Sequence, residues 1–215
     1  MTTYINQKKR NSPDLIHQLQ NLGKTPGICL FIDLVDSTPI KYEKPIEDWA
    51  RMINNTFNYL SFIKDFSSNI VKGIGDEIMI FIPIDILKSG TTLTDYYSVL
   101  SELYSTIYNI KYSPLKEDFY NCKMAIHYCE EVYNISFIEG HKDYYGIDID
   151  LSARLMSKAE ANSIIISESY FQKIQLDVEK NNIQETDEVT SNISELIDEH
   201  FKGVPHTTSY RILKV

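Results

Sequence analysis

The sequence has 215 residues, 43% of them hydrophobic, a length and composition that suit one compact domain with small additions. Its formal net charge of −9 argues against binding to nucleic acid or to an anionic membrane, both of which favour basic surfaces. A nucleotide remains compatible with this charge, because a divalent metal ion would supply positive charge locally. No apolar run is long enough to span a bilayer and no signal peptide is visible, so we expect a cytoplasmic protein.

The three cysteines, Cys29, Cys122 and Cys129, are odd in number and lack CxxC spacing. We therefore expect them to be small buried hydrophobes in a reducing compartment.

The N-terminal half is predicted to alternate between strands and helices. Residues 1–26 are polar and form an extension, with a short helix over 13–22, and the domain proper covers 27–215. Further elements follow from apolar runs, from helical spacing and from alternation. They are a buried strand over 28–34, a helix from Pro45 to Leu60, strands over 69–72 and 77–81 joined by a tight turn at 73–76, a helix over 93–110, and strands over 120–128 and 131–137.

The C-terminal half is predicted to contain a helix over 150–161, a strand over 163–167 and a short helix to about 174. Residues 177–200 are acidic and poor in large apolar residues, which indicates a surface excursion, partly helical near 193–197. A strand over 209–213 closes the chain. This order predicts an α+β fold, with a ferredoxin-like antiparallel sheet and additions.

The first candidate site is the segment Phe31-Ile32-Asp33-Leu34-Val35-Asp36-Ser37-Thr38. A carboxylate at the end of a buried strand is costly unless it has a partner such as a metal ion. A strand-end turn with free N–H groups also suits a triphosphate. The alternative is an aspartate that only caps the following helix.

The second candidate is Lys72-Gly73-Ile74-Gly75-Asp76-Glu77, whose glycines would by themselves indicate only a tight turn. In a ferredoxin-like sheet, however, this hairpin lies beside the first strand, so Asp76 is expected near Asp33. Two neighbouring carboxylates repel each other unless they share a cation. Mg²⁺ or Mn²⁺ prefers such hard oxygen ligands, and a pair of ions would activate a hydroxyl and hold a leaving phosphate.

Two further candidates lie in the C-terminal half. Asp150 and Arg154 are four residues apart on one face of a predicted helix, a spacing that an ordinary surface ion pair would also explain. Lys202 lies in Phe201-Lys202-Gly203 before the last strand, where a solvated lysine is the simpler interpretation.

Together these segments resemble, in order, the catalytic domain of class III nucleotidyl cyclases, over roughly residues 28–213. Phe-Ile-Asp-Leu-Val-Asp-Ser-Thr is similar to the first metal motif of that family, and Lys-Gly-Ile-Gly-Asp to the second. Met124-Ala125-Ile126-His127 is similar to a strand ending in Ile-His, Tyr145–Arg154 to the segment with the transition-state arginine, and Phe-Lys-Gly to the segment with the phosphate lysine.

The resemblance implies a homodimer with composite sites and two divalent ions, Mn²⁺ or Mg²⁺. Metal ligands would come from Asp33, Leu34 and Asp76 of one subunit, and the catalytic residues Arg154, Lys202 and Asp150 from the other. Nucleotide contacts would come from Asp36, Ser37, Thr38, Lys72 and Asp143, of which Lys72 and Asp143 fall where family members recognise the base.

Two positions depart from the family pattern: Asp150 replaces the usual asparagine, and Cys129 replaces a glycine. With the segment from Asp143 to Arg154, and with a cyclase domain expected to stand alone, the chain resembles the small pyrimidine cyclases of the bacterial Pycsar anti-phage system. That resemblance implies conversion of UTP to cyclic UMP and diphosphate, with the product read by a separate effector protein. The alternatives are a cytidylate cyclase, an adenylate cyclase, and a degenerate fold that only binds nucleotide.

Overall fold

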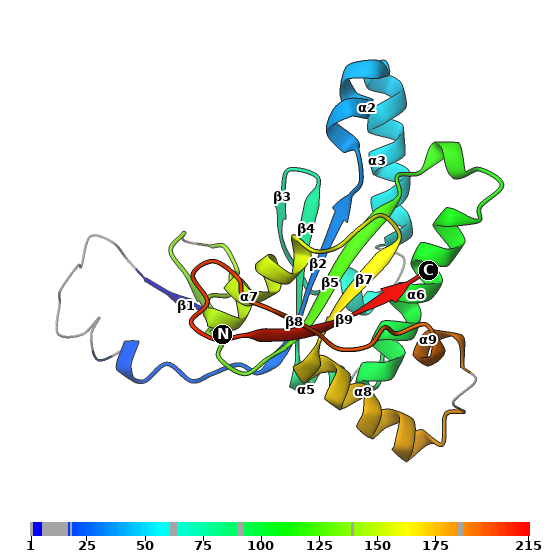
Figure 1. The fold of residues 1–215 in the computed structure, drawn as a ribbon. Coiled ribbons are helices and arrows are strands. Elements are labelled where there is room, and N and C mark those ends of the chain that lie inside the picture. Colours follow the sequence, from blue (N-terminus) through cyan, green and yellow to red (C-terminus); the bar gives the residue numbers. More distant parts are fainter. Residues whose placement is uncertain are drawn as a thin grey trace.

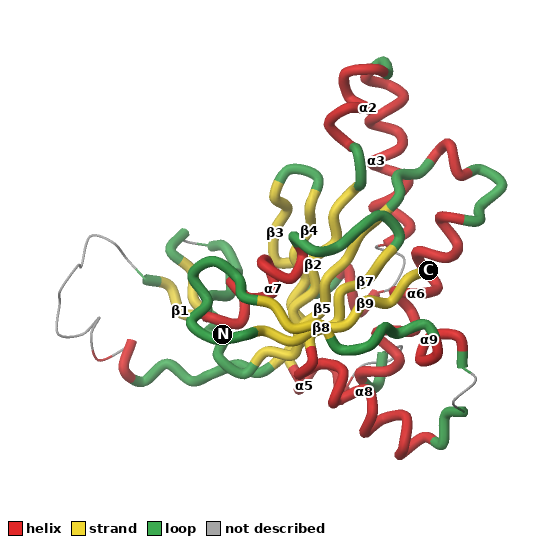
Figure 2. Tube along the Cα trace, viewed as in Figure 1, coloured by secondary structure: helices red, strands yellow, loops and turns green. Residues whose placement is uncertain are grey.

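The structure, a computed structural model, describes residues 2–5, 17, 19–60, 64–89, 93–138, 140–184 and 187–215. Its centre is a seven-stranded mixed sheet with the strand order β3-β4-β2-β5-β7-β9-β8 (Figures 1 and 2). The strands are β2 (Gly27–Leu34), β3 (Ile70–Ile74), β4 (Glu77–Pro83), β5 (Cys122–Cys129), β7 (Ser163–Ser167), β8 (Ile197–Glu199) and β9 (Thr208–Lys214).

The expected ferredoxin-like arrangement is confirmed in the first four strands of this sheet. The chain order β2, α3, β3, β4, α6, β5 gives the spatial order β3-β4-β2-β5, in which β2 is antiparallel to both β4 and β5. Strand β7 then adds in parallel to β5, β9 pairs with β7, and β8 forms the far edge. The helices are α2 (Ser37–Glu43), α3 (Ile46–Leu60), α4 (Lys64–Ser67), α5 (Ile84–Ser89), α6 (Tyr96–Lys111), α7 (Ile147–Met156), α8 (Glu168–Asn181) and α9 (Glu188–Ser191), with a short 3₁₀ turn at Lys116–Asp118.

The sheet has two different faces, because successive side chains of a strand point in opposite directions. Even-numbered residues of β2 and β5, such as Ile32 and Ile126, join a large apolar core with α3, α6 and α8. Odd-numbered residues, such as Phe31 and Ala125, join a smaller core on the face that α7 covers (Figure 1). We call these the helix-rich face and the α7 face.

Several predicted elements differ from the structure. The expected strand over 131–137 is reduced to β6 (Ile135–Ser136), which pairs in parallel with β1 (Thr3–Tyr4) outside the main sheet. Tyr133, two residues before β6, instead forms a single antiparallel bridge with Tyr145. The helix expected over 150–161 begins at Ile147 and ends at Met156, since the chain then makes turns that lead to Asn162 with φ of 58°.

The expected acidic excursion over 177–200 is also more ordered than predicted. Helix α8 continues to Asn181, where φ of 54° at Asn182 ends it. Strand β8 then pairs with β9 where the sequence predicted a surface segment, and Ile193, expected to be helical, bridges to Leu213. The predicted helix over 13–22 lies largely outside the described residues. None of the described helices has the length and apolar character to cross a bilayer.

Candidate functional site

The C-terminal end of β2 and the turn of the β3–β4 hairpin lie at the same end of the sheet (Figure 1), and the two candidate metal aspartates are in these two segments. The register pairs Asp33 with Glu77, so Asp76 lies one residue beyond this pair, in the turn. The turn has only two residues, Gly75 and Asp76, and Gly75 has φ of +69°, a conformation that favours glycine. The glycine-rich motif is therefore needed for a tight hairpin, and this hairpin positions a carboxylate.

Each aspartate is in contact with a lysine that sequence reasoning did not identify. Lys123 Nζ lies 3.0 Å from Asp33 Oδ2, because Lys123 is the register partner of Asp33 on β5. Lys41 Nζ, on α2, lies 3.7 Å from Asp76 Oδ1, and the Ser37 hydroxyl donates a hydrogen bond to Asp76 Oδ2. Both carboxylates are about one-quarter exposed, so they are reachable from solvent.

Glu77 adds a third carboxylate to this group. Burial raises its pKa, and the neighbouring Asp33 raises it further, while Lys123 acts in the opposite direction. The end of β2 thus concentrates negative charge that a cation would stabilise.

The donor set at this end fits hard divalent cations such as Mg²⁺ or Mn²⁺. Asp33 and Asp76 offer carboxylate oxygens, and the two lysines already place positive charge against both groups. The hydrocarbon side chain of Leu34 has no ligand atom, so only the main-chain oxygen of this buried residue could serve as a ligand. The evidence for this fit is the oxygen ligands of the two carboxylates and the two lysine ammonium groups that already pair with them.

The residues expected to contact phosphate surround the start of α2. Asp36 occupies the N-cap position with φ of 57°, and its side chain makes no cap hydrogen bond. The simple capping role that the sequence left open is therefore not the role of this carboxylate in the structure. Asp36 and Thr38 are exposed, and Ser37 is buried against Asp76.

Lys72 and Asp143 meet although 71 residues separate them. Lys72 Nζ lies 3.0 Å from Asp143 Oδ1 and 3.2 Å from Oδ2, which joins β3 to the loop before α7. The Tyr144 main-chain N–H also donates to Asp143 Oδ1 at 2.8 Å, and Lys72 lies 5.5 Å from the centroid of the Tyr145 ring. The resemblance to cyclases implies that these two residues recognise the base, and the structure places them in direct contact.

Helix α7 carries Asp150 and Arg154, and both side chains are exposed. Within the described residues no ion pair joins them, so the surface salt bridge that the spacing suggested does not form. The two residues line an open cavity of about 590 Å³ between α7 and the segment 203–206. A Cβ at Gly203 would lie 4.0 Å from Arg154 Nη2, so the neighbour of Lys202 lies close to the guanidinium.

The candidate residues thus form two groups within one chain. Asp33 and Asp76 lie at the end of β2, and Asp150 and Arg154 line the α7 cavity. Among the described residues that line this cavity, neither Asp33 nor Asp76 is found. His206 also lines it, and no sequence pattern points to this residue apart from its place near Lys202.

Comparisons with known proteins agree with this architecture. No protein-family model matches the sequence, and no curated protein matches it. Solved structures do: the guanylyl cyclase Cya2 aligns with a TM-score of 0.67 at 15% identity, over 89% of this chain and 93% of that chain. The adenylyl cyclase CyaB from P. aeruginosa aligns with a TM-score of 0.65 at 20% identity, over 91% and 97% of the two chains.

A third structure is the guanylate cyclase domain of RhGC from Catenaria anguillulae in complex with GTP. It aligns with a TM-score of 0.61 at 15% identity, over 88% of this chain and 97% of that chain. The mixed seven-stranded sheet with its helices therefore has the fold of the class III nucleotidyl cyclase catalytic domains.

Proposed function

We propose that this protein is a nucleotidyl cyclase that converts UTP to 3′,5′-cyclic UMP and diphosphate. In this reaction the ribose 3′ oxygen forms a bond to the α-phosphorus, the bond from that phosphorus to the bridging oxygen breaks, and the hydroxyl proton is removed. The observation that carries the proposal is the register that pairs Asp33 with Glu77, the residue next to Asp76, within a cyclase fold.

Asp33, Asp76 and the main-chain oxygen of Leu34 are proposed to hold two divalent ions, Mn²⁺ or Mg²⁺. When bound, such ions lower the pKa of the attacking hydroxyl and neutralise the charge on the leaving diphosphate. Lys123 and Lys41 would then exchange their carboxylate partners for solvent or phosphate. Asp36, Ser37 and Thr38 follow the strand end, where their N–H and hydroxyl groups would orient the triphosphate.

Arg154 and Lys202 are proposed to stabilise the negative charge of the transition state from a second subunit, and Asp150 to orient the ribose. Two features support a homodimer with composite sites: both cations are exposed, and the cavity next to Arg154 lacks the metal-site aspartates. A paired copy of the chain would bring the α7 cavity of one subunit against the β2 end of the other.

Lys72 and Asp143 are proposed to recognise the base, with Tyr145 beside them. Uracil offers carbonyl acceptors and a ring N–H donor, which match an ammonium and a carboxylate. The preference for a pyrimidine rests on the resemblance of residues 143–154 to pyrimidine cyclases of anti-phage systems. In that role the cyclic nucleotide would activate a separate effector protein.

The second candidate is an adenylate cyclase, which the direct Lys72–Asp143 contact also favours. A donor and an acceptor at the base edge would serve the ring nitrogen and amino group of adenine equally well. Pocket size, and not this pair, must therefore discriminate between the two bases.

Both candidates are tested by incubating the purified protein with Mn²⁺ and each of the four ribonucleoside triphosphates, and identifying products by mass. Cyclic UMP as the main product supports the proposal, whereas cyclic AMP as the main product replaces it with the second candidate. If no cyclic nucleotide forms from any substrate, and nucleotide binding persists, the chain is a binding module.

A further inference from the structure

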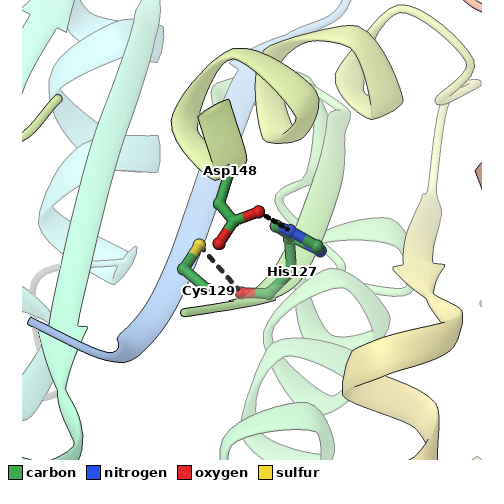
Figure 3. Close-up of side chains that lie close together, drawn as sticks. All are labelled: His127, Cys129 and Asp148. Atoms are coloured by element: carbon green, nitrogen blue, oxygen red, sulfur yellow. Dashed lines mark hydrogen bonds and ion pairs between the residues drawn. The ribbon is translucent and has the colours of Figure 1, made fainter. Parts of the chain in front are cut away.

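A second group of ligating side chains lies in the α7 face, away from the end of β2. His127 and Cys129 project from β5 toward Asp148 in the first turn of α7 (Figure 3). One ligand atom from each of the three residues lies within 4.8 Å of the other two. His127 is 5% exposed, Cys129 is 0% exposed and the Asp148 side chain is 17% exposed, so the group is largely shielded from solvent.

Among the described residues, one nitrogen of the His127 ring lacks a well-formed hydrogen bond. Ser169 Oγ donates to the Tyr128 carbonyl at 3.2 Å and lies 3.3 Å from His127 Nδ1. A proton on Nδ1 suits this arrangement, because Ser169 Oγ can then accept it while donating its own proton to the carbonyl. In that tautomer of the neutral ring Nε2 is a lone pair, and among the described residues this buried atom has no well-formed hydrogen bond, its nearest polar neighbour being Asp148.

The lone pair of His127 Nε2 faces a negatively charged oxygen. Asp148 Oδ1 lies 3.5 Å away, too far for a good hydrogen bond. Asp148 Oδ2 accepts main-chain N–H bonds from Glu130 and Glu131 at 2.6 Å each, which fixes the carboxylate. A lone pair and a carboxylate oxygen in this arrangement repel each other unless a proton or a metal ion lies between them, and a proton would make an imidazolium–carboxylate pair.

The separation of His127 Nε2 and Asp148 Oδ1 fits a tetrahedral metal ion. Zinc bonds of about 2.0–2.1 Å to nitrogen and oxygen put two tetrahedral ligand atoms about 3.3 Å apart, close to the observed separation. Cys129 would supply a thiolate, and its thiol proton would be released to solvent when the ion binds. Ser169 would act as the group that holds the metal-binding imidazole in its tautomer, a common arrangement around zinc.

We propose that His127, Cys129 and Asp148 form a structural site for a zinc-type divalent cation that joins β5 to α7. The fourth position is left to water or to Cys29, whose Cα is the register partner of His127. The mixed nitrogen, sulfur and oxygen donors distinguish this site from the all-oxygen site at Asp33 and Asp76, which suits Mg²⁺ or Mn²⁺. The ion would fix the first turn of the helix that carries Asp150 and Arg154.

The test uses the whole chain and measures the metal itself. Protein incubated with Zn²⁺ and dialysed should retain close to one zinc ion per chain by elemental analysis. Co²⁺ in place of Zn²⁺ should give the thiolate charge-transfer absorption and the intense visible bands of a tetrahedral site. Excess Mg²⁺ should leave both signals unchanged.

Variants identify the ligands. Cys129→Ser should lose the charge-transfer absorption, and His127→Gln should no longer retain the ion. Cys122→Ser is the matched control, since Cys122 is equally buried on the same strand but points to the helix-rich face, and it should retain the signal. Asp33→Ala should also retain it, which separates this site from the proposed catalytic one. Circular dichroism verifies that each variant is folded.

Two results would overturn the proposal. If the wild-type protein retains no zinc and shows no tetrahedral Co²⁺ spectrum, the group is an imidazolium–carboxylate pair that bridges β5 and α7. If the Co²⁺ signal persists in folded Cys129→Ser and disappears in Asp33→Ala, the ion binds elsewhere. Neither result depends on cyclase activity, so the proposed function stands or fails independently.

Discussion

The two faces of the central sheet share the same strands but carry different chemistry. On β2, Ile32 is 0% exposed in the apolar core of the helix-rich face, and the next residue, Asp33, points to the α7 face beside Lys123. On β5, Ile126 and His127 divide in the same way. In the part of the chain that the structure describes, the long helices α3, α6 and α8 cover the helix-rich face, whereas α7 covers the other face and borders an open cavity.

Because adjacent residues of one strand point to different faces, we expect one to affect mainly stability and the next to affect mainly function. The larger apolar core lies on the helix-rich face, where burial of aliphatic side chains stabilises the fold by roughly 25 cal/mol per Å² of apolar area. The other face can therefore hold carboxylates, lysines and an imidazole that a tightly packed core would exclude. Adjacent substitutions on one strand should consequently affect different measurements.

The largest expected effect is on catalysis. Asp33→Ala or Asp76→Ala should reduce cyclic nucleotide formation by about 10³-fold or more, because loss of metal-assisted activation removes several kcal/mol of transition-state stabilisation. The unfolding free energy should change by about 1 kcal/mol or less, since each carboxylate is part of a partly exposed ion pair. Product assays and urea unfolding measure the two quantities. Near-normal output from either folded variant would contradict the metal assignment.

The neighbouring residue should show the opposite pattern. Ile32→Ala should lower the unfolding free energy by about 2–5 kcal/mol, because it leaves a cavity in the core of the helix-rich face. At a temperature where the variant stays folded, its kcat should remain within a few-fold of wild type. A large loss of kcat without loss of stability would show that the two faces are not separable in this way.

Much of this separation could be predicted from the sequence. The run Ile28–Leu34 predicted a buried strand, and Asp33 at its end predicted a site, because a buried carboxylate needs a partner. The Lys123 contact could not be predicted, since it depends on the register between β2 and β5. The same holds for His127 and Asp148, which are 21 positions apart and meet only when α7 packs on the sheet.

The shorter elements show the same limit. Strands β1 and β6 have two residues each, too few for any alternation to be visible. Strand β8 contains two acidic residues, as is common at a sheet edge, and this composition predicted a surface segment. The length of α8 was predicted too short, although the helical spacing of Phe171, Ile174 and Val178 in the sequence indicates the longer helix.

The next smaller expected effect is on the choice of substrate, which tests the proposed base-recognition residues Lys72 and Asp143. With UTP and ATP at equal concentrations, kcat/KM for UTP should exceed that for ATP by at least about tenfold, or 1.4 kcal/mol, if Lys72, Asp143 and the pocket around them fit a pyrimidine. Competition assays give the ratio directly. Faster turnover of ATP than of both UTP and CTP would replace the pyrimidine assignment with the adenylate one.

Subunit mixing tests whether the α7 face of one chain completes the β2 end of another. Mixtures of inactive Asp33→Ala and Arg154→Ala should recover about a quarter of wild-type activity, because half of randomly formed dimers are mixed and each has one intact site of two. Subunit exchange is verified with two differently tagged chains. Absence of recovery despite proven exchange would place each site within a single chain.

The smallest expected effect concerns a carboxylate on the helix-rich side. Asp177 on α8 accepts main-chain N–H bonds from Tyr96 and Tyr97 at the start of α6, at 2.7 and 3.2 Å. Burial raises the pKa of Asp177, and the nearby Asp95 adds to this, although the N–H bonds oppose it. The folded protein therefore binds a proton here at a pH where the unfolded chain has lost it.

Stability contributed by Asp177 should thus be fully present below its unfolded pKa of about 3.9 and be lost as pH rises through the folded pKa. Asp177→Asn keeps an oxygen acceptor for the N–H bonds but removes this titration. The variant should therefore lack part of the wild-type decline in unfolding free energy above pH 4, by less than about 1 kcal/mol because the group is only half-buried. Urea unfolding of both proteins at several pH values gives the slopes. Glu179→Gln, an exposed carboxylate on the same helix, is the control for net charge, and equal slopes in wild type and Asp177→Asn would show that this contact does not couple stability to pH.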